Sequence, residues 1–220
     1  MKLISFIGEE RADFAYYVAV ILKNTGKRVL VLDNSISGDL FTAVARNNPD
    51  AMMERTHSVQ NLVFVRCAAY QAESFSKFDY VICYAGNSYI EDTICKSDLV
   101  CFMPDYRPVS LNRGRDLLCS LLEQAGMEAA EGKYFIIMRD LVSDKITDLA
   151  IAELMQTDTE RIIGHIADDP GDYAKYITFL YNGRQTIKGL SSDYMGALNY
   201  VIGRITNENE KMIRKIMKKA

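Results

Sequence analysis

Hydrophobic and polar positions along the chain follow a pattern that predicts strands and helices in turn. Residues 2–7 are almost all apolar and indicate a buried first strand, which Gly8 ends as a turn. Residues 11–24 place their apolar side chains on one face of a helix, and Gly26 terminates that helix. Residues 28–32 form a second apolar run. Together these segments have the length of a strand–helix–strand unit with a parallel crossover.

The same alternation continues through the rest of the chain. It predicts further strands over residues 61–67, 78–84, 99–103, 133–138 and 161–166. It predicts helices over residues 40–46, 90–96, 111–125, 146–155, 173–180 and 194–219, with a break at 47–50 and a helix cap at Ser143 or Asp144. The last of these is either one long helix or an interrupted one. Strands that alternate with helices indicate a mostly parallel sheet with helices on both faces. We therefore expect an α/β protein with a single three-layer α/β/α domain over residues 1–220.

Composition narrows the possible classes of function. The chain has 220 residues, of which 49% are hydrophobic, with only two histidines and a net charge of −3. This charge argues against a general nucleic-acid-binding surface, and so few histidines make a metal centre an unexpected feature. The five cysteines show no Cys-x-x-Cys spacing, so we expect reduced, buried thiols in a cytoplasmic protein. The absence of a signal-peptide pattern supports the same expectation.

Four motifs occur in a distinctive order. Residues 26–33 read Gly-Lys-Arg-Val-Leu-Val-Leu-Asp, a strand that ends in an aspartate. Residues 78–86 form an apolar strand that ends in Ala-Gly, and residues 97–104 and 162–168 each combine a strand with a loop. This order resembles that of the MinD/ParA-type P-loop ATPases. In that family the four segments correspond to the second strand, the Walker B strand with its switch glycine, a later strand and loop, and the loop that flanks the adenine. The resemblance covers nearly the whole chain and implies the P-loop NTPase fold.

The first loop departs from the pattern of this family. The family's loop reads Gly-Lys-Gly-Gly-x-Gly-Lys-Thr, in which backbone N–H groups and the lysine hold the phosphates and the hydroxyl holds Mg²⁺. Here the loop is shorter and keeps only Gly8, and Arg11 stands where the second lysine belongs. Ala12 occupies the position of the Mg²⁺ ligand, and Glu9 and Glu10 stand where the triphosphate would be and would repel it.

The Walker B position is also altered, because Tyr84 replaces the family's aspartate. Phosphoryl transfer depends on positioning and charge neutralisation, so these losses together predict a pseudo-ATPase without catalytic residues. We expect no cofactor, with weak Mg²⁺-free ATP binding through the helix N-terminus as the alternative. The candidate cofactor-binding residues form the degenerate phosphate-loop region: Gly8, Glu9, Glu10, Arg11, Ala12, Asp13 and Asp33.

The resemblance implies a role in placing other proteins. Members of the family position division, partition, flagellar or pilus machines, so we expect a non-catalytic scaffold or a localisation and assembly factor that acts through protein partners. We also expect a homodimer through the face that carries residues 8–14, in which Arg11 pairs either across the two-fold axis or with Glu9 or Asp33 of its own chain. Two alternatives are an ATPase with a variant phosphate loop and a nucleic-acid-binding partition module, although we do not expect nucleic acid as a partner.

Residues 207–220 form a basic amphipathic segment. Apolar side chains at four positions fall on one helical stripe, and cations flank that stripe. One interpretation is that the stripe packs on the body of the domain. The other is peripheral contact with an anionic membrane at the inner face, since each cation near such a surface contributes about 1 kcal/mol. The residues for membrane or partner contact are Lys211, Met212, Ile213, Arg214, Lys215, Ile216, Met217, Lys218 and Lys219.

Overall fold

The computed structural model describes residues 1–9, 11–66, 72–88, 94–126, 132–141, 146–184 and 186–218. In this part of the chain, eight strands form one sheet in the order β3-β4-β2-β5-β1-β6-β7-β8. Neighbouring strands pair in parallel, except for the antiparallel pair of β3 with β4. The strands are β1 (Lys2–Gly8), β2 (Val29–Asp33), β3 (Thr56–Val59), β4 (Leu62–Arg66), β5 (Tyr80–Gly86), β6 (Leu99–Met103), β7 (Tyr134–Leu141) and β8 (Ile162–Ala167).

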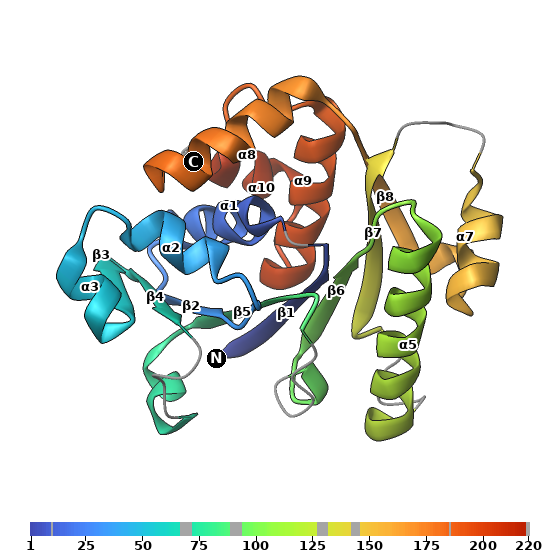
Figure 1. Ribbon diagram of the computed structural model, residues 1–220, viewed down its shortest axis with the longest axis horizontal. Coiled ribbons are helices and arrows are strands. Elements are labelled where there is room, and N and C mark those ends of the chain that lie inside the picture. The colour runs from blue at the N-terminus through green and yellow to red at the C-terminus, as the bar shows by residue number, and fades with distance from the viewer. Residues whose placement is uncertain are drawn as a thin grey trace.

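Helices cover both faces of this sheet, as Figure 1 shows. The first and last helices of the chain lie on one face, and α5 and α7 lie on the other. The helices are α1 (Ala12–Lys23), α2 (Asp39–Ala45), α3 (Pro49–Glu54), α5 (Pro108–Ala125), α7 (Asp148–Met155), α8 (Pro170–Asn182), α9 (Ser192–Thr206) and α10 (Glu210–Met217), with short 3₁₀ turns η2 (Ala72–Lys77) and η3 (Thr159–Arg161). The predicted α/β class with a mostly parallel sheet is confirmed.

The central strand shows how the sequence places two cores. Side chains alternate between the faces of a strand, so Ile4 and Phe6 of β1 pack in the core beneath α1, α8 and α9. Ile7 points to the opposite face and packs in the core beneath α5 and α7. Strand β1 lies between β5 and β6 at the centre of the sheet, and the two cores pack against its opposite faces. This packing fixes the end of β1, where the first loop begins.

Two predicted boundaries were wrong, each for a local reason. The break at 47–50 is the start of α3, because Asn48 accepts a hydrogen bond from the N–H of Ala51 and Pro49 occupies the first helical position. Thr147 is the cap of α7; Ser143 and Asp144 lie outside the described residues. The interruption that the sequence allowed in the last helix occurs at Asn207, which has a left-handed backbone with φ 56° and separates α9 from α10. Most of the predicted helix 90–96 and Cys67 also lie outside the described residues.

Helix α10 packs on the body of the domain. Its side chains Ile213 and Met217 are 6% and 4% exposed and belong to the core beneath α9. A Cβ atom at Gly203 of α9 would lie 3.0 Å from Ile213 Cδ1, so the two helices approach closely at this glycine. Met212, by contrast, is 41% exposed. Membrane contact through this helix would therefore depend on Met212, the half-buried Ile216 and the basic side chains.

Candidate functional site

The loop between β1 and α1 uses its own backbone groups. Gly8 has a φ of +140°, and a Cβ atom there would lie 2.3 Å from the carbonyl oxygen of Met103, so the position requires glycine. The N–H of Glu9 donates to that same Met103 oxygen at 3.0 Å, and the N–H of Arg11 donates to the oxygen of Glu9 at 2.8 Å. The N–H groups of Glu9 and Arg11 are therefore already paired within the chain.

The side chain of Arg11 is fixed by three contacts within the chain. Its Nη2 lies 2.6 Å from Oδ1 of Asp140, which follows the buried part of β7. The guanidinium also lies 5.3 Å and 5.2 Å from the ring centres of Tyr173 and Tyr176, both on α8. Of the alternatives weighed from the sequence, pairing within the chain agrees with the structure, but the partner is Asp140.

Glu9 pairs on the other side of the loop. Its Oε2 lies 2.8 Å from Nη2 of Arg107, which is in the connection between β6 and α5. Arg107 Nε in turn lies 2.5 Å from Oδ2 of Asp105, and this hydrogen bond, followed by the charge of Glu9, raises the pKa of the Arg107 guanidinium. The loop is thus held between two ion pairs, Glu9–Arg107 and Arg11–Asp140. Glu10 lies outside the described residues.

A buried polar cluster lies beneath the start of α1. Asp13, Arg139 and Tyr194 are 1%, 2% and 0% exposed. The Tyr194 hydroxyl donates to Oδ2 of Asp13 at 2.8 Å, and the Arg139 guanidinium lies 5.1 Å from the centre of the Tyr194 ring. Burial, together with the charge of Asp13, raises the pKa of Tyr194, so its hydroxyl remains a donor. Within the described residues, Asp13 Oδ1 and Arg139 Nε and Nη1 have no hydrogen-bond partner.

Two residues of this cluster, Arg139 and Tyr194, were not among the site residues predicted from the sequence. The predicted strand ended at Met138, whereas β7 continues to Leu141 and carries Arg139 into the interior. A single cation directly after an apolar run of five residues, Tyr134 to Met138, is a signal that could have drawn attention to Arg139.

Ala12 and Asp13 are buried in the first turn of α1, so neither side chain faces the space beyond the loop.

Comparisons with known proteins identify the architecture. No protein-family profile matches the sequence, and no curated protein sequence matches it. Solved structures do match. A chain of the MinC:MinD cell division protein complex from Aquifex aeolicus superposes with a TM-score of 0.65 at 14% identity, over 92% of this chain and 96% of that one. A putative plasmid partition protein from Borrelia burgdorferi bound to AMPPNP gives 0.64 at 13% identity, over 92% and 99%. A ParA family ATPase from Chlorobium tepidum gives 0.59 at 12% identity, over 99% and 97%.

The chain has the MinD/ParA fold. At these identities the likeness establishes the architecture alone. The expected MinD/ParA-like sheet and helices are confirmed by it, whereas the activity of this chain is a separate question.

Asp33 has a local role within this MinD/ParA fold. Its Oδ1 accepts hydrogen bonds from the N–H and hydroxyl of Ser35, at 3.1 Å and 2.6 Å, and its Oδ2 accepts from the N–H of Phe41 at 2.8 Å. Arg66 also lies 3.4 Å from Oδ1. Because β5 separates β2 from β1, Asp33 is about 10 Å from the first loop, roughly two strand spacings. The structure thus brings together the residues of 8–13 that it describes, but uses Asp33 to shape the loop after β2.

Tyr84, at the Walker B position of the resemblance, is 3% exposed and belongs to the core beneath α1. Its backbone pairs with Asp33 across β2 and β5. A buried phenol cannot replace a carboxylate in orienting a hydrated Mg²⁺ ion. In the part of the chain that the structure describes, no group of three His, Cys, Asp or Glu side chains is arranged to hold a metal ion.

A hydrogen-bonded chain on the opposite face also escaped the sequence analysis. His165 on β8 bonds to the Tyr106 hydroxyl through Nδ1, and its Nε2 lies 2.8 Å from Oδ1 of Asp148. In a neutral ring whose Nε2–H donates to Asp148, Nδ1 accepts from Tyr106. Burial, and then the charge of Asp148, raises the pKa of the Tyr106 hydroxyl. These bonds join β8 and α7 to the β6–α5 connection.

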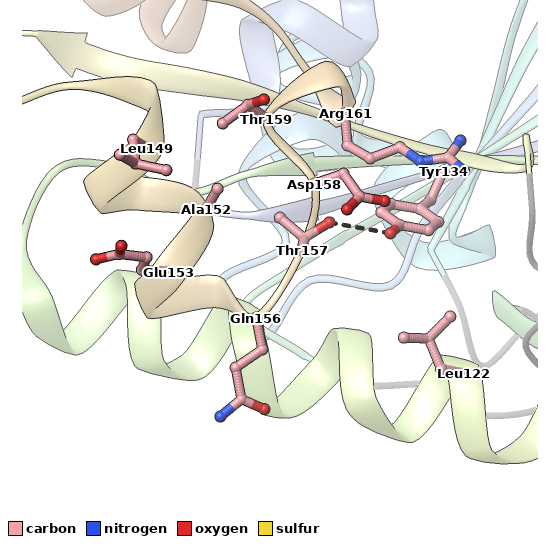
Figure 2. Close-up of a pocket in the computed structure, with 10 residues that line it drawn as sticks. All are labelled: Leu122, Tyr134, Leu149, Ala152, Glu153, Gln156, Thr157, Asp158, Thr159 and Arg161. Carbon is pink, nitrogen blue, oxygen red and sulfur yellow. Dashed lines mark hydrogen bonds between the residues drawn. The ribbon is translucent and has the colours of Figure 1, made fainter.

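The groove in Figure 2 lies away from the first loop. It has a volume of about 780 Å³ and opens between α5, α7 and the first residues of β7. Arg161 covers the Tyr134 ring at 5.0 Å, and the Tyr134 hydroxyl bonds to Thr157 at 3.0 Å. The other residues that line the groove include apolar, polar and acidic side chains: Leu122, Leu149, Ala152, Glu153, Gln156, Asp158 and Thr159. Although large, this groove contains none of the residues predicted for nucleotide binding.

Proposed function

We propose that this chain is a non-catalytic MinD/ParA-like scaffold or assembly factor for a larger protein machine. The observation that carries the proposal is the loop closed by its own ion pairs, Glu9–Arg107 and Arg11–Asp140. The loop offers neither a lysine nor a hydroxyl, and the N–H groups of Glu9 and Arg11 are already paired. Catalysis of phosphoryl transfer needs those groups together.

The purified protein is expected not to hydrolyse ATP in the presence of Mg²⁺. The variant carrying both Arg11→Lys and Ala12→Thr is expected to remain inactive, because it restores two side chains but not the longer loop that wraps the phosphates. Turnover is measured by phosphate release, with an active ParA-type ATPase as the positive control.

Release above about 1 phosphate per minute, a modest rate for an enzyme, would show that the chain is an ATPase with a variant loop. A rise in melting temperature on adding ATP without Mg²⁺ would show that the nucleotide site is retained for binding.

The same proposal includes a homodimer through the face that carries residues 8–14. Three exposed apolar side chains lie at this edge of the sheet, where a partner would cover them: Ile36 (78%) in the connection after β2, Val109 (71%) in the first turn of α5 and Tyr173 (50%) in the first turn of α8. The MinC:MinD complex shows that a protein of this fold assembles with another protein. In a nucleotide-dependent dimer, the nucleotide would contact the first loop. Here contacts within the chain take that place, so formation of the dimer needs no ATP.

Light scattering without nucleotide is expected to give twice the chain mass of 24.9 kDa at micromolar concentration. Ile36→Glu is expected to shift the protein to the monomer, because the substitution places a charge in an apolar contact. Met53→Glu is the matched control, since Met53 is also 78% exposed but lies on α3. A monomer at high concentration, or equal effects of the two substitutions, would refute this dimer.

The tail helix gives no independent support for a membrane role. Among the described residues, none of the helices is both long and apolar enough to span a bilayer. The burial of Ile213 and Met217 leaves mainly charges for contact with an anionic surface. Such contact would be strongly weakened by salt, because exposed charges are screened within about 8–10 Å at physiological ionic strength.

A further inference from the structure

A second groove lies between α9, α10 and the segment 186–190 that precedes α9. We call it the tail groove, and its volume is about 850 Å³, within the range of about 300–1,000 Å³ typical of ligand pockets. Its lining comes from three places in the sequence: Thr186, Ile187, Lys188, Gly189 and Leu190; Met195 and Asn199; and Arg214, Met217 and Lys218. Figure 1 shows α9 and α10 on the same face of the sheet. No residue of the first loop lines the tail groove.

The tail groove combines an apolar lining with a basic rim. Ile187 and Met217 are 5% and 4% exposed, and Leu190 and Met195 pack against the same core. Lys188, Arg214 and Lys218 supply three positive charges, and no acidic side chain is among the described residues that line the groove. An occupant with apolar groups flanked by negative charges matches this arrangement.

The cations of the rim are available to such an occupant. Arg214 pairs with Glu210 at 2.5 Å, but the two side chains are 68% and 75% exposed. An exposed pair of this kind within one helix contributes little to stability, so a carboxylate of a partner can replace Glu210. A further cation lies close by, since a Cβ atom at Gly189 would be 3.9 Å from Nζ of Lys175.

Asn199 points to the kind of molecule that fits. Its Oδ1 atom is buried and has no hydrogen-bond partner among the described residues. A buried acceptor without a donor is unfavourable, so an N–H group of an occupant that reached it would be favoured. A peptide carries such donors on its backbone and side chains, whereas the hydrocarbon tails of a lipid carry none.

We propose that the tail groove binds an acidic amphipathic segment of a protein partner. The apolar side of the segment would lie on Met195 and Met217, and its carboxylates would face Lys188, Arg214 and Lys218. The inference rests on the proposed scaffold function and names the chemistry of the partner. A membrane is the disfavoured occupant, because the apolar side chains Ile187 and Met217 line a concavity and are buried, whereas a bilayer requires apolar groups that protrude.

The test is a selection from displayed random peptides against the full chain. The peptides are long enough for about four helical turns, and binding is performed at low salt. We expect enriched sequences to repeat apolar residues at helical spacing with aspartate or glutamate beside them. The enriched peptides are then measured individually by fluorescence anisotropy.

Two double variants separate the tail groove from general charge. Lys188→Glu with Lys218→Glu is expected to weaken binding of the enriched peptides about tenfold or more. Lys27→Glu with Lys77→Glu makes the same change in net charge at exposed lysines outside the groove, and is expected to leave binding within about twofold. Circular dichroism confirms that both variants are folded.

Four outcomes would overturn the proposal: no enrichment, enrichment of basic sequences, equal weakening by the two double variants, or loss of anionic-vesicle binding in the groove variant alone. The last outcome would make the groove a lipid site. ATP turnover of the same preparation is a separate measurement, so failure of the tail groove and failure of the scaffold proposal are told apart.

Discussion

Replacing Arg139 with methionine is expected to lower the free energy of unfolding by about 3–5 kcal/mol, because it leaves the buried charge of Asp13 without its cation. The two charges lie in the interior with Tyr194 between them, and both side chains are 2% exposed or less. Methionine fills a similar volume, so the loss reports on charge and not on a cavity. Denaturant unfolding monitored by circular dichroism measures it.

The control for this prediction has two parts. Arg115→Met removes a half-buried arginine that pairs, among the described residues, with its neighbour Asp116, and is expected to change stability by less than about 0.5 kcal/mol. The double variant Asp13→Asn with Arg139→Met is expected to be more stable than Arg139→Met alone, because no unpaired charge remains buried. If the double variant loses the sum of the two single effects, the two residues are not coupled.

Replacing Gly8 with alanine is expected to cost roughly 4 kcal/mol or more. The added Cβ would lie 2.3 Å from the Met103 carbonyl oxygen, and backbone cannot move aside as a flexible side chain can. Gly8 pairs with Met103 across β1 and β6, so relief of the clash would separate the ends of the two central strands. Thermal and denaturant unfolding measure the loss.

Gly26→Ala is the matched control for the Gly8 substitution. Gly26 also has a positive φ, +84°, but a Cβ atom there would meet nothing within 4 Å. The control therefore carries backbone strain alone, about 1–2 kcal/mol. Equal losses for the two variants would mean that the Met103 contact has no effect. A larger loss at Gly8 assigns this glycine to close strand packing, a role that needs no bound phosphate.

The sequence was sufficient to predict the sheet because its strands are continuous apolar runs. Residues 29–33 and 99–103 are buried on both faces of a parallel sheet, and such strands are visible without knowledge of their neighbours. Strand β3 (Thr56–Val59) was missed because its four residues form an antiparallel edge strand and none of them is buried. Its pattern is therefore too short to stand out.

The site could be predicted only in part, because its closure depends on distant pairs. The altered residues 8–13 are visible in the sequence as a contiguous block. The partners of that block are not, since Arg11 and Asp140 are separated by 129 positions and Asp13 and Tyr194 by 181. Alternatives within the loop, Glu9 or Asp33, were nearer in sequence, but the sheet places Asp140 beside Arg11 through β7.

The ion pairs on the first loop have a consequence for timing in the cell. In a protein that changes shape when a nucleotide is exchanged, the rate of hydrolysis sets how long the bound state lasts. Under the proposed function, a loop tied by Arg11–Asp140 and Glu9–Arg107 would not pass through such a cycle. Under the proposed function, assembly and release then follow mass action, so the abundance of the chain and of its partner sets when the machine is built. Control would lie in synthesis and degradation, on the scale of a cell generation, and not in a catalytic cycle.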